Sequence, residues 1–154
     1  MSIVVDASVA VLPATAREDP RSGQARALLV ESHDRGVLRA PAVLAWEVGN
    51  VMHRKEKGAI PGDVAARARV TSMIVGLFEL VVPDSDALQR IGEIAERASL
   101  TFYDASYVEL AARDDVGVLV TEDRQLLRRA RDELGQDRAF DVELGAFAVE
   151  QGLV

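Results

Sequence analysis

The sequence predicts an α/β fold in which a central parallel sheet of about five strands is covered by helices on both faces. Short runs of aliphatic residues, the first over residues 3–5, are typical of strands that are buried on both faces. Longer segments with apolar residues at helical spacing separate these runs, as expected for a parallel sheet. The 154 residues contain no internal repeat or low-complexity segment, so we expect a single domain over residues 1–154.

The individual elements are predicted from β-branched runs, helical spacing and the positions of proline and glycine. Pro13 should end the first helix, and the charged segment 13–22 with its two prolines predicts a loop. Pro41 is expected to be the first residue of the helix that carries Glu47. The apolar last dozen residues are expected to close a sheet edge or to pack on a partner. The predicted strands lie at 3–5, 37–38, 79–82, 117–120 and, weakly, 140–142, and the predicted helices at 7–12, 23–35, 42–57, 61–77, 85–98, 102–115 and 124–134.

Composition argues against several classes of function. There is no cysteine, so neither a disulfide framework nor thiol chemistry is available. The two histidines, His33 and His53, leave little material for a histidine-based zinc site or a Ser-His-Asp triad. A net charge of −7 argues against unspecific binding to polyanions. No apolar run approaches the roughly 18 residues of a membrane span and no signal-peptide pattern begins the chain, so we expect a cytoplasmic location.

Four acidic residues are predicted to meet at one edge of the sheet. Asp6 and Asp123 directly follow predicted strands, and α/β proteins bind ligands at the carboxyl ends of their parallel strands. Glu47 and Asp104 lie in the first turns of helices that flank the same edge. Two unit charges about 4 Å apart repel by about 4 kcal/mol at an effective dielectric constant near 20. Such a cluster therefore requires protonation or a bound cation.

Each of these acids also has a simpler interpretation. Asp6 and Asp123 can cap the helices that follow them. Asp104 can serve a capping box or the helix dipole, and Glu47 can pair with Arg54 or face solvent. If they instead share an ion, oxygen ligands without histidine or cysteine favour Mg²⁺ or Mn²⁺ over zinc. An ion of this kind suits phosphate-ester chemistry, because it can activate water and neutralise charge on the phosphoryl group.

The four acids lie in short motifs that occur together in a known family. The motifs are Val4-Val5-Asp6-Ala7-Ser8-Val9-Ala10, Glu47-Val48-Gly49-Asn50-Val51, Tyr103-Asp104-Ala105-Ser106-Tyr107 and Leu119-Val120-Thr121-Glu122-Asp123-Arg124-Gln125-Leu126. In this order and spacing they resemble the PIN domain, and in particular the bacterial VapC-type toxins, over residues 3 to about 134. The chain departs from the family pattern at 12–15, where many relatives have a lysine or tryptophan and a short apolar run.

The resemblance implies a three-layer α/β/α fold with a sheet of strand order 3-2-1-4-5. It also implies a ribonuclease, here an endonuclease, that requires Mg²⁺ or Mn²⁺ and acts as the toxin of a type II toxin–antitoxin system. A small cognate antitoxin encoded beside it would be its protein partner. The matched positions are Asp6, Glu47, Asp104 and Asp123 for the acids that bind the metal and activate water, and Ser8, Asn50 and Thr121 for polar residues that support the site.

Basic residues near the acids are candidates for binding RNA phosphates, although such runs are as often solvated helix faces. They are Arg54, Lys55 and Lys57 after Glu47, and Arg124, Arg128, Arg129 and Arg131 after Asp123; Arg54, Arg124 and Arg128 are the predicted RNA contacts.

The helix predicted at 61–77 is apolar on more than one face. Together with the family resemblance, this predicts a homodimer or a larger toxin–antitoxin assembly. The alternative is a helix buried between two neighbours of the same chain. The apolar residues in question are Ile60, Val64, Val70, Met73, Ile74 and Leu77.

Two other classes of function stay open on the sequence. One is a metal-dependent phosphatase or phosphotransferase, which would also begin with an aspartate after the first strand. A covalent-aspartate phosphatase usually has a second aspartate where this chain has Ser8, and a lysine near the site. The other is a non-catalytic binding module with a PIN-like fold, against which the presence of all four acids argues.

Overall fold

The computed structural model describes residues 1–16, 18–54, 62–114 and 117–153. The predictions that concern Lys55, Lys57, Ile60, Pro61 and Asp115 lie outside the described residues.

Five parallel strands form the sheet in the order β3-β2-β1-β4-β5. This confirms both the predicted fold class and the strand order implied by the family resemblance. Val5 at the end of β1 is paired with Val120 at the end of β4, so the residues that follow these two strands emerge side by side. The strands are β1 (Ile3–Val5), β2 (Leu38–Pro41), β3 (Glu79–Val81), β4 (Val118–Val120) and β5 (Ala139–Phe140).

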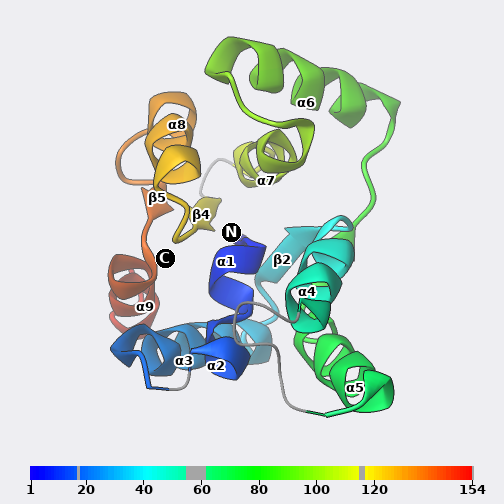
Figure 1. The fold of residues 1–154 in the computed structure, drawn as a ribbon. Coiled ribbons are helices and arrows are strands. Elements are labelled where there is room, and N and C mark those ends of the chain that lie inside the picture. Colours follow the sequence, from blue (N-terminus) through cyan, green and yellow to red (C-terminus); the bar gives the residue numbers. More distant parts are fainter. Residues whose placement is uncertain (17, 55–61, 115–116, 154) are drawn as a thin grey trace.

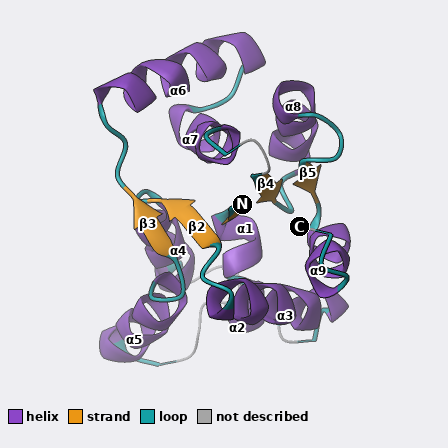
Figure 2. Ribbon diagram, turned by 180° about the vertical axis from the view of Figure 1, so that it is seen from behind, coloured by secondary structure: helices purple, strands orange, loops and turns teal. Residues whose placement is uncertain are grey.

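Helices cover both faces of the sheet (Figure 1, Figure 2). On one face α7 packs over β1, β2 and β4 and is flanked by α6 and α8, while α3 and α9 pack together on the other face. α4 packs with α5. The helices are α1 (Ala7–Ala10), α2 (Leu12–Thr15), α3 (Pro20–Asp34), α4 (Leu44–His53), α5 (Val64–Val75), α6 (Ser85–Ala98), α7 (Phe102–Ala112), α8 (Arg124–Leu134) and α9 (Val142–Glu150). In the described ranges, none of them combines the length and the apolar character that crossing a membrane requires.

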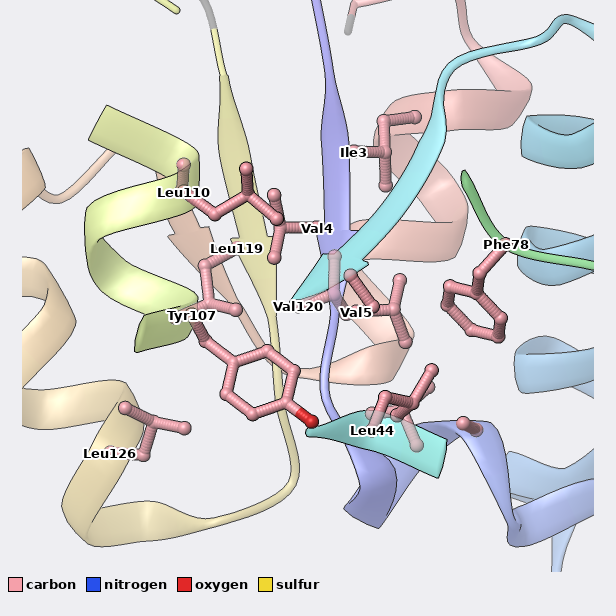
Figure 3. Packing of buried hydrophobic residues seen from close by; sticks show 14 of the residues in the cluster. Ile3, Val4, Val5, Leu44, Phe78, Tyr107, Leu110, Leu119, Val120 and Leu126 are labelled. Carbon is pink, nitrogen blue, oxygen red and sulfur yellow. The ribbon is translucent and has the colours of Figure 1, made fainter. Parts of the chain in front are cut away.

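The core centres on β1 and β4, whose side chains are almost completely buried. Figure 3 shows Tyr107 and Leu110 reaching from α7 toward these strands, with Leu126 of α8 beside them. Burying one aliphatic side chain of this size contributes about 1.5–3 kcal/mol to folding. The strands are therefore held firmly, and the first residues beyond their carboxyl ends start from fixed positions.

The predicted loop over residues 13–22 is wrong, because two helices occupy most of it. Pro13 lies in the first turn of α2, and Pro20 is the first residue of α3, which Asp19 caps. Proline is compatible with these positions because backbone N–H groups in the first turn have no partner within the helix. The first helix accordingly ends at Ala10, before α2 begins at Leu12.

Two further expectations are corrected. Pro41 does not open a helix but ends β2 beside Val81, and α4 begins three residues later. A proline at the end of a strand removes little from the ladder of hydrogen bonds. The last dozen residues do not add a strand to the sheet edge: Asp141 caps α9, which packs against α3 and contacts β5. Leu144 and Phe147 of α9 are exposed, so packing on a partner stays a prediction.

Candidate active site

Asp6 lies at the carboxyl end of β1 and is held by three hydrogen bonds. Its Oδ1 accepts one from the Ser8 hydroxyl at 2.6 Å and one from the Val9 amide at 3.3 Å, and its Oδ2 accepts one from the Thr121 hydroxyl at 2.8 Å. The Val9 bond is the helix cap that the simpler interpretation expects. The two hydroxyl bonds go beyond what a cap requires, so Asp6 is fixed in a single orientation.

The two hydroxyls are themselves oriented by the turn between β4 and α8. The oxygen of Ser8 accepts a hydrogen bond from the Glu122 amide at 2.9 Å, and that of Thr121 accepts one from the Asp123 amide at 3.0 Å. Because each oxygen accepts from the backbone, each hydroxyl hydrogen remains available to Asp6. Ser8 and Thr121, both predicted as supporting residues, thus join β1 and β4 around this carboxylate.

Burial raises the pKa of Asp6 to about 7, although the hydrogen bonds from Ser8, Thr121 and Val9 act in the opposite direction. The negative charge of Glu47 raises it further. Only 6 % of Asp6 is exposed, and none of the described lysine or arginine side chains forms an ion pair with it. A buried carboxylate held only by neutral donors is an unusual arrangement that a cation would stabilise.

Glu47 lies in the first turn of α4 and is partly buried. Its Oε2 accepts a hydrogen bond of 2.5 Å from the hydroxyl of Tyr107. The predicted alternative of a pair with Arg54 is therefore wrong; Arg54 is exposed at the end of α4. Burial raises the pKa of Glu47, the bond from Tyr107 lowers it, and the charge of Asp104 raises it.

Asp104 occupies the third position of α7, as predicted. Its amide donates to the Thr101 hydroxyl oxygen at 3.0 Å, and that hydroxyl donates to Asp104 Oδ2 at 2.7 Å. The simpler role at a helix start is thus present as well. Because Asp104 acts on Glu47, and Glu47 on Asp6, the three carboxylates form one electrostatically connected group.

The side chains of two predicted site residues form no hydrogen bond with this group. Asp123 is exposed and caps α8, with its Oδ1 accepting hydrogen bonds from the amides of Gln125 and Leu126. Its link to Asp6 runs through its own amide and Thr121. Asn50 is exposed on α4, and its side chain forms no hydrogen bond with another residue of the described ranges.

The predicted RNA contacts are all at the surface. Arg54 follows α4, and Arg124 and Arg128 lie one turn apart on α8, directly after Asp123. All three are exposed, and within the part of the chain that the structure describes none of them pairs with an acid. They are therefore available to anionic ligands.

The donor set fits a divalent cation in its chemistry. Asp6, Glu47 and Asp104 offer only carboxylate oxygens, which Mg²⁺ and Mn²⁺ prefer. Over the described ranges, however, no three histidine or acidic side chains lie close enough together to form a preformed metal-binding site. Asp6 is buried and held by three hydrogen bonds, whereas Glu47 and Asp104 are partly exposed and each accepts one side-chain hydrogen bond.

Two residues of the site were not predicted from the sequence. Tyr107 belongs to the third motif, but its hydrogen bond to Glu47 spans 60 residues of sequence. The only feature of the sequence that could have indicated a role in the site is its position one helical turn after Asp104. Glu122 holds Ser8 by its amide, while its side chain accepts a hydrogen bond from the Val142 amide at 2.9 Å and pairs with Arg21 at 2.6 Å. No local pattern predicts partners so distant in the sequence.

A parallel α/β/α protein of strand order 3-2-1-4-5, with carboxylates at the carboxyl edge, is of the PIN-like class. The family model of the PIN domain matches residues 3–132, and the chain therefore belongs to the PIN domain family. This confirms the resemblance drawn from the four motifs.

Two relatives of the chain come from Pyrobaculum aerophilum. The curated protein named exonuclease VapC9 is 32 % identical over 99 residues. This alignment covers 64 % of the present chain and 66 % of VapC9, just under two thirds of that relative's length. The crystal structure of PAE2754 is 27 % identical and superposes with a TM-score of 0.67, covering 98 % of this chain and 90 % of that one.

Proposed function

We propose that this protein is a divalent-metal-dependent ribonuclease that acts in the cytoplasm as the toxin of a toxin–antitoxin pair. Membership of the PIN domain family and the similarity to a protein named exonuclease VapC9 support a nuclease. The observation that carries the proposal is Asp6, a buried carboxylate at the end of β1 with neutral hydrogen-bond partners. The charge of Glu47 acts on Asp6, and that of Asp104 acts on Glu47.

The acidic quartet would hold Mg²⁺ or Mn²⁺. Asp6 would be the ligand at the end of β1, Glu47 and Asp104 would be the ligands from α4 and α7, and Asp123 would be the fourth ligand at the start of α8. When bound, the ion supplies activation of water and neutralisation of charge on the phosphodiester. Ser8 and Thr121 keep Asp6 in place, and Asn50 is proposed to support the site from α4.

Arg54, Arg124 and Arg128 are the proposed contacts to RNA phosphates. Each is exposed, and within the described ranges none is neutralised by an acid, so each can release counterions when RNA binds. We propose cleavage within the chain, as in an endonuclease, whereas the relative VapC9 is named an exonuclease. Substrates labelled separately at the 5′ and the 3′ end distinguish the two modes of cleavage.

The proposed partners are a small antitoxin and a second copy of this chain. Among the described apolar residues of α5, only Ile74 is buried, whereas Met73 is 73 % exposed and Val64 is exposed as well. This argues against the alternative of a helix enclosed by its own chain. A cavity of about 330 Å³ lies beside Met73, lined also by Leu29 and Val30 of α3. Apolar surface of this kind is typical of interaction sites.

The experiment that tests the activity is incubation of the purified protein with structured RNAs in Mg²⁺, Mn²⁺ or EDTA, followed by mapping of the cut sites. Asp6→Asn and Asp104→Asn should each lower the rate by about a hundredfold or more, which corresponds to about 3 kcal/mol of transition-state stabilisation. Asp63→Asn is the matched control, because Asp63 caps α5 and makes no contact with the quartet. Unchanged cleavage in both site variants would contradict the proposed quartet.

A further inference from the structure

Tyr107 connects the hydrophobic core with the acidic site. It lies in the middle of α7 and is 1 % exposed, with its ring packed beside β1 and β4 (Figure 3). Its hydroxyl points out of the core toward the start of α4, where it donates the 2.5 Å hydrogen bond to Glu47 Oε2 (Figure 3). The core thereby fixes the position of the hydrogen bond that Glu47 receives.

The chemistry of this bond suits a residue that orients a carboxylate. A buried phenol must find an acceptor, and a bond to a carboxylate is stronger than one between neutral groups. The phenol hydroxyl carries one hydrogen, and it donates that hydrogen to Glu47. It engages one oxygen of Glu47 and leaves Oε1 available.

The position of Tyr107 on α7 links two of the proposed ligands. Asp104 and Tyr107 are three residues apart and so lie on the same side of one helix. α7 therefore carries one acid itself and, through Tyr107, holds a second acid that comes from α4. The separation between Asp104 and Glu47 is then set by a rigid helix and not by the free rotation of a glutamate on the surface.

We propose that Tyr107 is a positioning residue of the metal site, which orients the carboxylate of Glu47 before the cation arrives. This inference rests on the proposed metal-dependent nuclease. The competing explanation is that Tyr107 only fills the core and that Glu47 merely satisfies its hydroxyl. The two explanations differ in what loss of the hydroxyl does to metal binding.

The test compares Tyr107→Phe with Tyr103→Phe. Both tyrosines of the chain lie on α7, but Tyr103 is 61 % exposed and donates no side-chain hydrogen bond to a described residue. Mn²⁺ binding is measured without RNA from the electron paramagnetic resonance signal of the free ion. Because removal of a residue that orients a ligand typically lowers metal affinity 10- to 100-fold, we expect at least tenfold weaker binding for Tyr107→Phe and wild-type binding for Tyr103→Phe.

Two further measurements separate positioning from packing. At limiting Mn²⁺, kcat should fall about tenfold in Tyr107→Phe while KM for RNA stays unchanged, because a buried hydroxyl cannot contact the substrate. In a Glu47→Ala background, Tyr107→Phe should have no additional effect on Mn²⁺ affinity, since it acts through Glu47. The ring is retained, so the secondary structure measured by circular dichroism should match the wild type.

The outcomes distinguish the two proposals. Wild-type Mn²⁺ affinity in Tyr107→Phe, with tight binding by the unmodified protein, would overturn the positioning role and leave the proposed nuclease intact. A tenfold loss that persists in the Glu47→Ala background would also overturn it. Absence of both Mn²⁺ binding and RNA cleavage in the unmodified protein would overturn the proposed function, and this inference with it.

Discussion

Replacing Asp6 by asparagine should stabilise the protein at neutral pH when no metal is present. Asp6 is buried at the end of β1, receives hydrogen bonds only from neutral donors and lies in the field of Glu47. Ionising it in the folded protein is therefore unfavourable. Asparagine has nearly the same shape and no charge, so it removes this cost without leaving a cavity.

The magnitude follows from the pKa. The pKa of Asp6 rises from 3.8 to about 7 on folding, so between these values the folded protein keeps a proton that the unfolded chain has released. The free energy of unfolding then falls as pH rises, by about 1.4 kcal/mol per pH unit and about 4 kcal/mol in total. Below pH 4 this loss is absent, and above pH 7 it is complete.

Asparagine should recover only part of this energy. Its amide group presents a donor where the aspartate presented an acceptor to Ser8 or Thr121, and readjusting that contact costs about 1–2 kcal/mol. At pH 8 we expect Asp6→Asn to be more stable than the wild type by about 2 kcal/mol. At pH 4 we expect it to be equal or less stable, so the two stability curves cross.

Urea unfolding in EDTA at several pH values measures this difference. Circular dichroism is the appropriate probe, because the single tryptophan, Trp46, is 69 % exposed and would report little on the core. Addition of Mn²⁺ should stabilise the wild type in proportion to its binding but leave Asp6→Asn unchanged. If the stability difference between Asp6→Asn and wild type is the same at pH 4 and pH 8, the burial argument for Asp6 is wrong.

Three further predictions concern packing, substrate and assembly. Gly145→Ala should lower the free energy of unfolding in urea by about 1–3 kcal/mol, because its Cβ would lie 2.8 Å from Val120 Cγ1. Gly92→Ala is the control: open space surrounds this glycine, so the free energy of unfolding should stay unchanged or rise. Charge reversal of Arg124 and Arg128 to glutamate should weaken RNA binding. The slope of the logarithm of the binding constant against the logarithm of salt concentration should decrease in magnitude by about one per lost phosphate contact. An unchanged slope would show that the two arginines are solvated and do not contact RNA. Met73→Glu should shift light scattering toward monomer with unchanged thermal stability, and a wild type that is already monomeric would contradict an α5 interface.

Much of the fold was predictable from the sequence because its strands are buried on both faces. Residues 3–5 and 118–120 are continuous aliphatic runs, and such short runs are typical of parallel strands that are buried on both faces. The strand order came from the family resemblance and not from periodicity. Several errors lie at prolines, since Pro13, Pro20 and Pro41 permit a turn, a first helical turn or a strand end, and only tertiary packing decides among them. The helix α9 was also not predicted.

The site was predictable in its acids and less so in their contacts. Asp6 is adjacent to a strand end, so its location follows directly from the sheet. The helix-start positions of Glu47 and Asp104 likewise follow from local patterns, whereas the hydroxyl of Tyr107 reaches Glu47 only because α7 and α4 pack at a particular separation. A position close to a strand end does not by itself place a carboxylate in the site. Asp123 follows β4 closely, but its carboxylate accepts hydrogen bonds from the amides of α8.

The departure from the family pattern at residues 12–15 is followed by a segment that contacts the turn behind Asp6. These residues form α2, which returns the chain to α3, where Arg21 pairs with Glu122. Glu122 also accepts a hydrogen bond from the start of α9, and its amide holds the Ser8 hydroxyl that orients Asp6. The segment after the departure thus helps to fix the turn behind Asp6, so replacing Arg21 should loosen this carboxylate even though the two residues share no bond.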